Sequence, residues 1–490
     1  MEEGGDQEGV LTEVGAVLDG RVGRRVAWNA TLLSGAQAAN LLLHLVWFAL
    51  LSSHLGPGPL GTYVFAVAVP DLLGPVVDFG FTAMVARTVA QEPRREGVLI
   101  PNLFYLRLVV AAACYGATIG FLHQIGYHPA TVHAATVATI IAVLTTMQSL
   151  QVTLEVRLKM AWVAIGNLVE SLILVGGVVL LVHHHAGLVA FIWLYVAATG
   201  ISLAVAAGRA LTVTGYRWRP EPAAMGPVIR AALPLGATGV ITGLYYRLDV
   251  LVLARVHNST AVGQFGAGYR FIDAFAAFPG LLVALLNPVF ARAAGRGEEV
   301  LRRRFGVAMH LATVPTVIFG VGGAMVAWRA LPALHAFRHY HGGGEVLAIL
   351  APAAGLILMG SVLSGVLFNS HQQRLLLAVA VGVLAVNLVL VGVLVPVFSY
   401  LGAAAATTAV EAVSVAALAV ASNWRLGTGW PLDRLRQTLL AGGLLAVVLA
   451  VGYLLPPLVQ LALGVVAAPV LVVLTGALGR SDLAVLRRST

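Results

Sequence analysis

Several ionisable side chains of this sequence lie inside long apolar stretches, where a charge is costly. Inserting such a group at membrane depth costs about 2.5–3.5 kcal/mol or more, so each one requires a partner or a function. Guanidinium groups bind phosphates through two parallel hydrogen bonds, whereas carboxylates can carry a proton or a small cation. We therefore expect a bound anion, a coupling ion, or both. The basic candidates are Arg107, Arg247 and Arg270, and the acidic candidates are Asp71, Glu170, Asp249 and Asp273.

The spacing of these residues limits which of them can act together. Arg270 and Asp273 are three positions apart, so they share one helical face and could neutralise each other. Arg247 and Asp249 are two positions apart, about 200° around a helix, and cannot both face one cavity. Arg107 is close to the start of its apolar stretch, so it could reach the membrane interface. Arg247 and Arg270 are the sharper candidates for holding a diphosphate, and the Arg270–Asp273 ion pair is the alternative.

Asp71 is expected near the midplane of the membrane. It follows Gly61 by ten residues, which is about 15 Å along a helix at 1.5 Å per residue. Pro70 and Pro75 interrupt the helical hydrogen bonds around it and should kink the helix. Asp71 is either a protonatable coupling site or a structural carboxylate bonded to a neighbouring helix. Asp78 is closer to the cytoplasmic end and could reach water.

Polar side chains also follow one face of two apolar stretches. A polar face on an otherwise apolar helix must look toward a cavity or a partner helix. Amides and an imidazole suit sugar hydroxyls, and they equally suit hydrogen bonds between helices. The first stretch contributes Gln37, Asn40 and His44 as candidate substrate ligands. The seventh has a matching stripe, which comprises Thr238, Thr242, Tyr245 or Tyr246, and Asp249.

The composition identifies the solvent around these residues as lipid. Of 490 residues, 59% are hydrophobic and 10% are charged, against about 25% charged in an ordinary soluble domain. The net charge of +9 lies in short connections between apolar stretches, so it indicates membrane orientation and not a nucleic-acid partner. Cys114 is the single cysteine, so an intramolecular disulfide is excluded.

The fold class expected from this pattern is an all-α polytopic membrane protein with about fourteen transmembrane helices. Only Arg255, Arg329 and Arg338 fall in external connections if the N-terminus is inside, and nearly all other basic residues fall on the cytoplasmic side. Both termini are therefore expected in the cytoplasm. The expected spans are 29–53, 60–84, 101–126, 130–153, 162–184, 187–208, 228–255, 261–290, 305–328, 345–369, 374–397, 401–422, 436–455 and 457–478.

A weak internal repeat suggests how the spans are grouped. GTYVFAVAVPD from Gly61 and GQFGAGYRFID from Gly263 share a glycine, an aromatic residue and an aspartate in register. Chance similarity between apolar helices is the alternative. The repeat favours two parallel six-helix lobes around a central cavity plus two extra C-terminal helices. The expected units are a cytoplasmic acidic tail (1–25), an N-lobe (26–215), a cytoplasmic linker (216–227), a C-lobe (228–422), and spans 13–14 with a cytoplasmic tail (423–490).

No motif of a known catalytic site occurs in the chain, and no connection is long enough to fold into a catalytic domain. We therefore expect a transporter and not an enzyme. Eleven of the fourteen histidines lie in the expected outer connections, but HHH and HYH do not have the spacing of a zinc site. Neither a metal nor a cofactor is expected.

Two stretches of the sequence resemble a known family. Leu55 to Ala90 and Ala231 to Phe275 are similar to the spans that open the two halves of bacterial polysaccharide-transport flippases. These flippases belong to the superfamily of multidrug and toxin extrusion transporters and lipid II flippases. The resemblance implies a two-lobed helical bundle around a central cavity. It also implies movement of undecaprenyl-diphosphate-linked oligosaccharide between leaflets. The acidic N-terminal tail and the histidine-rich outer loops depart from the family pattern.

The expected function is therefore a flippase that moves this lipid from the inner to the outer leaflet of the bacterial cytoplasmic membrane by alternating access. The expected partners are the lipid-linked oligosaccharide and membrane lipids, together with a polysaccharide polymerase and glycosyltransferases. A multidrug or toxin cation antiporter and an intramembrane glycosyl-transfer enzyme are the alternatives. A cation antiporter should have a net acidic cavity, whereas a diphosphate carrier should present arginines to its substrate.

Overall fold

The computed structural model describes residues 35–157, 159–275, 297–370, 372–429 and 435–478, together with parts of 278–290. The expected acidic tail (1–25) and the beginning of the first expected span lie outside these residues. Nearly all described residues are helical, and no strand occurs among them.

The helices follow one another with short connections. The first is Gly35–Leu55. The others are α2 (Pro57–Asp78), α3 (Phe81–Gln91), α4 (Glu96–Ile125), α5 (Pro129–Leu144), α6 (Gln148–Val156), α7 (Ala161–His183), α8 (Leu188–Leu211), α9 (Pro222–Val256), α10 (Ser259–Phe275), α12 (Glu298–Ala333), α13 (His341–Asn369), α14 (Gln373–Leu426), α15 (Leu435–Val451) and α16 (Pro457–Leu474). α9 begins inside the stretch 216–227 that was expected to be a linker.

Twelve helical segments within the described ranges are long and apolar enough to cross a membrane. Two local features account for the difference between these twelve segments and the fourteen expected spans. α14 has 54 residues, about 80 Å of helix, which is far longer than the roughly 30 Å hydrocarbon core. It is broken at Ser399 (φ 54°, ψ −133°), between the expected spans 374–397 and 401–422. α10 covers the first part of the expected span 261–290, and most of the remainder lies outside the described residues. The chain is therefore an all-α, multi-pass membrane protein.

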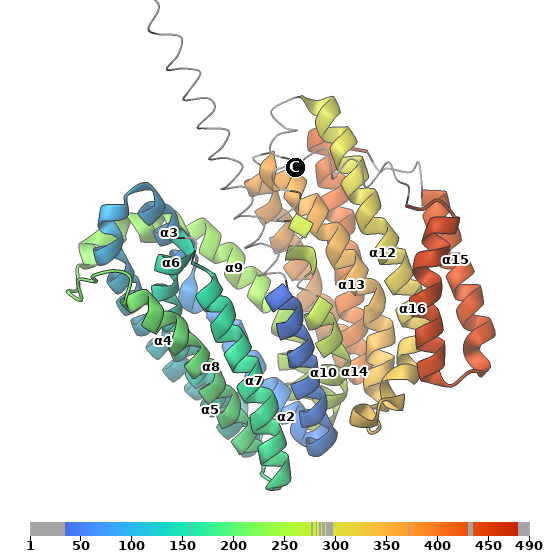
Figure 1. Ribbon diagram of the computed structural model, residues 1–490, viewed down its shortest axis with the longest axis horizontal. Coiled ribbons are helices and arrows are strands. Elements are labelled where there is room, and N and C mark those ends of the chain that lie inside the picture. Colours follow the sequence, from blue (N-terminus) through green and yellow to red (C-terminus); the bar gives the residue numbers. More distant parts are fainter. Residues whose placement is uncertain are drawn as a thin grey trace, which may run out of the picture.

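The helices form two groups joined by central helices (Figure 1). α3 to α8 pack on one another in the first group, and α12 to α16 pack on one another in the second. α2, α9 and α10 contact one another between the groups. The groups meet where α2 and α10 begin, and they diverge toward the end of the molecule that carries α3 and the start of α12 (Figure 1).

α9 connects the two groups because its start and its end are buried in different hydrophobic cores. Near its start, Met225 and Ala232 are buried in the same core as residues of α3, α4 and α6. Near its end, Leu248 and Leu253 are buried in a larger core that includes α2, α10, α13 and α14. Pro234 lies between these two ends, where its missing N–H weakens the helix.

Candidate functional site

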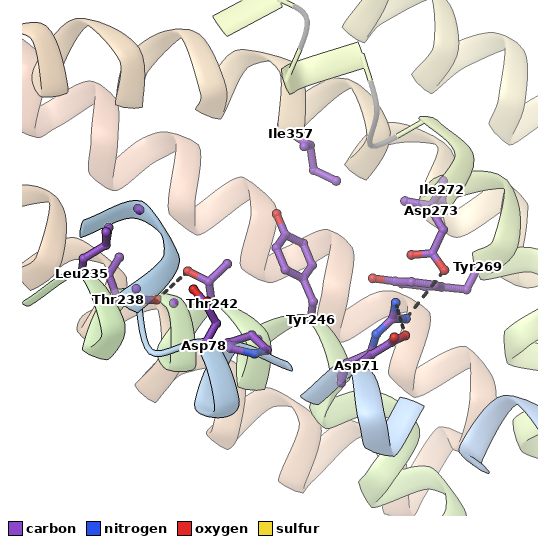
Figure 2. A pocket seen from close by; sticks show the side chains of 16 residues that line it. Asp71, Asp78, Leu235, Thr238, Thr242, Tyr246, Tyr269, Ile272, Asp273 and Ile357 are labelled. Carbon is purple, nitrogen blue, oxygen red and sulfur yellow. Dashed lines mark hydrogen bonds and ion pairs between the residues drawn. The ribbon is translucent and has the colours of Figure 1, made fainter. Parts of the chain in front are cut away.

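A cavity of about 730 Å³ lies between the two groups of helices. Its walls come from α2, α3, α9, α10 and α13 (Figure 2). The volume falls in the range of 300–1,000 Å³ that is typical of ligand sites. Three members of the expected stripe on α9, Thr238, Thr242 and Tyr246, face this space. We call it the wide cavity.

One end of the wide cavity is closed by an arginine between two carboxylates from different helices. Arg247 Nη2 of α9 lies 3.0 Å from Asp71 Oδ2 of α2, and Arg247 Nη1 lies 3.6 Å from Asp273 Oδ2 of α10. Figure 2 shows the two aspartates converging on the same point, with dashed lines that mark both ion pairs. The side chains of Asp71 and Asp273 are 42% and 29% exposed. This cluster of three residues, which we call the partition, ties three helices together.

The ion pair between Arg270 and Asp273, which the sequence allows as an alternative, does not form. Asp273 lies against Arg247 of the neighbouring helix. Arg270 instead donates to His44 Nδ1 at 3.2 Å and stacks on Trp47 and Phe48, with 5.5 and 5.3 Å from its guanidinium carbon to the ring centres. Within the described residues, no carboxylate lies at ion-pair distance from Arg270. Aromatic faces therefore stabilise this charge.

A second, smaller space of about 60 Å³ lies on the other side of the partition. Asp71, Arg247, Tyr269 and Asp273 line both spaces, so the partition separates them. The rest of the small space is lined by aromatic side chains from the first helix, α2, α8 and α10, by aliphatic side chains of α2 and α9, and by Arg270. We call it the aromatic chamber.

Beyond the aromatic chamber, α2 and α10 are in direct backbone contact. A Cβ at Gly61 would overlap with the Ser259 carbonyl, and a Cβ at Gly263 would overlap with the Pro57 carbonyl. Only glycine permits this approach. Tyr340 donates to the Ser52 carbonyl at 3.0 Å nearby, and burial raises the pKa of Tyr340, which keeps the phenol protonated. We call the Gly61–Gly263 contact the seal.

Arg107 does not reach the interface as expected. Its side chain is only 2% exposed. It donates to Thr82 at 3.2 Å and to Gln148 at 3.3 Å, and it lies 3.6 Å from Asp78. Asp78 lines the wide cavity and also accepts a hydrogen bond from Thr82. Arg107 therefore supports the cavity wall from behind, because polar partners on three helices stabilise it in the interior.

Next to Asp78, the wall of the wide cavity is formed by the junction between α2 and α3. The expected span 60–84 contains both, because α2 runs through Pro70 and Pro75 and ends at Asp78. Phe79 and Gly80 then adopt left-handed conformations, with φ values of 42° and 73°. α3 begins at the next residue, so the first turn of α3 borders the cavity at Ala83.

The remaining candidates lie outside the linings of the two spaces. Asp249 is 4% exposed and accepts from Thr407 at 2.5 Å, and its Oδ1 has no partner among the described residues. Glu170 accepts from Thr199 at 2.7 Å. Asn40 accepts from Ser171, and Gln37 is exposed. Asp249 and Arg247 face different neighbours, as their two-residue spacing predicts.

Tyrosines are the site residues that sequence reasoning missed. Tyr63 and Tyr195 line the aromatic chamber, and Tyr269 lines both spaces. Tyr269 is the neighbour of Arg270 in the repeated stretch GAGYRFID, so its position could have been a signal. The sequence allows either Tyr245 or Tyr246 on the polar stripe of α9, and the structure separates them. Tyr246 faces the wide cavity, and Tyr245 donates to Glu411 at 2.6 Å.

The outer histidines do not gather into a metal site in the part of the chain that the structure describes. No group of three or more histidine, cysteine, aspartate or glutamate side chains there could hold a metal ion.

Solved structures with the same arrangement of helices are membrane transporters. A lipid II flippase, MurJ, in an inward closed conformation superposes with a TM-score of 0.76 at 13% identity, over 91% of this chain and 98% of that chain. An inward-facing multidrug resistance MATE transporter gives 0.58 at 14% identity, over 79% and 94%. The Vibrio cholerae MATE transporter VcmN in its bent form gives 0.53 at 14% identity, over 82% and 98%. These likenesses establish the fold.

The sequence itself identifies the family. No individually curated protein matches it significantly. A family model described as polysaccharide biosynthesis protein matches residues 26–294. This match covers more than half of the 490 residues, including the first helix, the partition and the seal. The chain is therefore a member of the polysaccharide biosynthesis protein family.

Proposed function

We propose that this protein is a flippase for undecaprenyl-diphosphate-linked oligosaccharide. It moves this lipid from the inner to the outer leaflet of the bacterial cytoplasmic membrane for the synthesis of cell-surface polysaccharide. The observation that carries the proposal is one route divided by the partition, with the wide cavity on one side and, on the other, the small aromatic chamber that ends at the seal. A route that is closed at one end at a time is what alternating access requires.

In this proposal the wide cavity faces the cytoplasm and the seal faces outside, with both termini inside. The excess of basic residues on the side of α3 and the start of α12 supports this orientation. The N-lobe (26–215) and the C-lobe (228–422) rock against each other, and spans 13–14 (423–490) accompany the C-lobe. The polymerase and glycosyltransferases of the same biosynthesis are the proposed partners.

The diphosphate is held by Arg247 and Arg270, which both line the aromatic chamber. Arg270 has no carboxylate partner among the described residues, but Arg247 must first release Asp71 or Asp273. Protonation of either aspartate, or a cation bound to it, weakens its ion pair and frees guanidinium donors for phosphate. Asp71 and Asp273 are therefore the leading coupling sites, and Glu170 and Asp249 are secondary candidates.

Cation antiport is the second candidate, and one observation favours it. The lining of the wide cavity has three negatively charged side chains, Asp71, Asp78 and Asp273, and one positively charged side chain, Arg247. Such a lining is net acidic and attracts cations. Arg107 lies behind the cavity wall, and Arg270 lies beyond the partition. With these two arginines, the positive charges offset the three carboxylates for the site as a whole. Family membership and these two arginines favour the flippase.

The test uses the native host without its own copy of the gene. Cells that carry the Arg247→Ala/Arg270→Ala double variant should make no surface polysaccharide, although the protein reaches the membrane at the wild-type level. Arg255→Ala, which changes an exposed arginine of the same helix, is the control and should restore synthesis. Normal polysaccharide from the double variant would contradict the phosphate role. Polysaccharide that persists without the gene, together with gene-dependent export of a cationic dye, would favour antiport.

A further inference from the structure

The aromatic chamber has a chemistry of its own, which differs from that of the partition. Trp47 of the first helix stacks on Tyr195 of α8 at 6.2 Å between ring centres and meets Tyr63 of α2 edge-on at 6.1 Å. Phe265 and Tyr269 of α10 stack at 5.2 Å. All five rings line the chamber. They present apolar faces from both sides of the route.

Hydrogen-bond donors in this chamber have no protein partner. Trp47 is 3% exposed, and its indole N–H has none. The hydroxyls of Tyr63, Tyr195 and Tyr269 also form no hydrogen bond with any described residue, but unlike the indole N–H they are not fully buried and are open to the space. More than about 90% of buried polar groups in proteins are satisfied, so the buried indole N–H without a partner indicates a polar ligand, and the three open hydroxyls offer it further hydrogen bonds.

The charges at the chamber restrict the kind of ligand. Arg247 and Arg270 are matched by Asp71 and Asp273, so the lining carries no formal net charge. A second phosphate would need a surplus of positive charge, and an acyl chain would leave the donors unsatisfied. A sugar ring is neutral, presents C–H groups to aromatic faces, and accepts hydrogen bonds through its hydroxyls. The lining therefore matches carbohydrate.

We infer that the aromatic chamber is a subsite for the sugar residue next to the diphosphate, with Trp47 and Tyr195 as its specificity-determining contacts. The inference rests on the proposed function. The diphosphate at the partition places this sugar on the side of the seal. The chamber has a volume of only about 60 Å³ in this conformation. A six-membered ring such as benzene needs a cavity of about 150 Å³, so the chamber accepts the sugar ring as α2 and α10 separate.

The experiment measures the affinity of the purified full-length protein in nanodiscs for two lipids. One is undecaprenyl diphosphate with the oligosaccharide of the native host, and the other is undecaprenyl diphosphate without sugar. Trp47→Phe removes the indole N–H and keeps a ring, and Tyr195→Phe removes a single hydroxyl. Each should weaken binding of the glycan-bearing lipid about fivefold, the value of one hydrogen bond. Neither should change binding of the sugar-free lipid.

Trp193→Phe is the matched control, because Trp193 lies on α8 with its side chain exposed outside the chamber. It should change neither affinity. Tyr195→Phe keeps the test valid if Trp47→Phe does not fold. Equal binding of both lipids by the wild type, or equal losses for both lipids in the variants, would overturn the subsite and leave the flippase proposal intact. A wild type that binds neither lipid would overturn the proposed function, and the subsite with it.

Discussion

The two spaces on either side of the partition differ in size and in lining. The wide cavity has a volume of about 730 Å³ and presents carboxylates, threonines and glycines, whereas the aromatic chamber has about 60 Å³ and presents rings and arginines. They share the partition and Tyr269. The difference shows that one half of the route is open in this conformation while the other half is closed.

Helix packing explains which half is closed. At the seal, Gly61 and Gly263 allow the backbones of α2 and α10 to touch. At the other end, α2 stops at Asp78, and the break at Phe79 and Gly80 leads into α3, whose first turn borders the wide cavity. Closure thus depends on small residues that permit contact, and the open half depends on a helix that ends early.

The largest expected effect comes from enlarging the seal. Gly61→Leu places a side chain where the Ser259 backbone lies, and such overpacking costs the closed state about 1–3 kcal/mol. The equilibrium should shift toward the form open at the seal by about fivefold to 150-fold, and transport should stop. The measurement is labelling of a Val67→Cys variant, in the chamber wall, by an impermeant maleimide added from outside.

This labelling is performed in a Cys114→Ser background, because Cys114 is the single native cysteine. Gly116→Leu on α4 is the matched control, since a Cβ there meets nothing within 4 Å. It should leave labelling and transport unchanged. Labelling of Val67→Cys that does not rise with Gly61→Leu would show that the seal does not control access to the chamber.

A second prediction distinguishes the role of Arg107, which lies behind the wall of the wide cavity, from the role of Arg247 in the partition. Arg107→Met should lower the free energy of unfolding by about 2–4 kcal/mol, because Asp78 and Gln148 lose their partner in the interior. Arg247→Met should change stability much less and transport much more, since its partners face the wide cavity. Thermal unfolding in detergent measures the first effect, with the exposed Arg255→Met as control. An Arg107→Met protein as stable as the wild type would contradict a supporting role for Arg107.

The smallest effect is expected from neutralising one side of the partition. Asp71→Asn leaves Arg247 paired with Asp273, and ion pairs that face a water-filled space contribute about 0.2–1 kcal/mol each. The rate of lipid movement should fall about two- to fivefold without stopping. Asp78→Asn is the control, because Asp78 lines the same cavity and pairs with Arg107 instead. Complete loss of movement in Asp71→Asn would make Asp71 an obligatory coupling site.

The sequence predicted the helical class well because apolar length is a local property. Even the break at Ser399 fell between two expected spans, next to Pro396. The break of α2 was not anticipated, since the sequence pointed to Pro70 and Pro75 and the helix tolerates both. A proline removes one hydrogen bond, whereas two consecutive left-handed residues end the helix.

The partners within the site could not be predicted in the same way. Asp71, Arg247 and Asp273 were all identified as costly charges, but their pairing depends on the relative depth and rotation of three helices. Arg107 has its partners on other helices, so its distance from the end of its own span was misleading. Tyr63 and Tyr195 lie in apolar stretches, where an aromatic residue that faces a chamber has the same local pattern as one that faces lipid.

The most direct test of the flippase is movement of a labelled undecaprenyl-diphosphate-linked oligosaccharide in proteoliposomes, at equal pH and sodium on both sides. An inside-negative potential favours outward movement of about two negative charges by roughly 4–5 kcal/mol per 100 mV. The wild type should carry the lipid to the outer leaflet at a rate that rises with this potential, and Arg247→Ala/Arg270→Ala should not. A protein that leaves the lipid in place at every potential and carries a cationic dye instead would contradict the account.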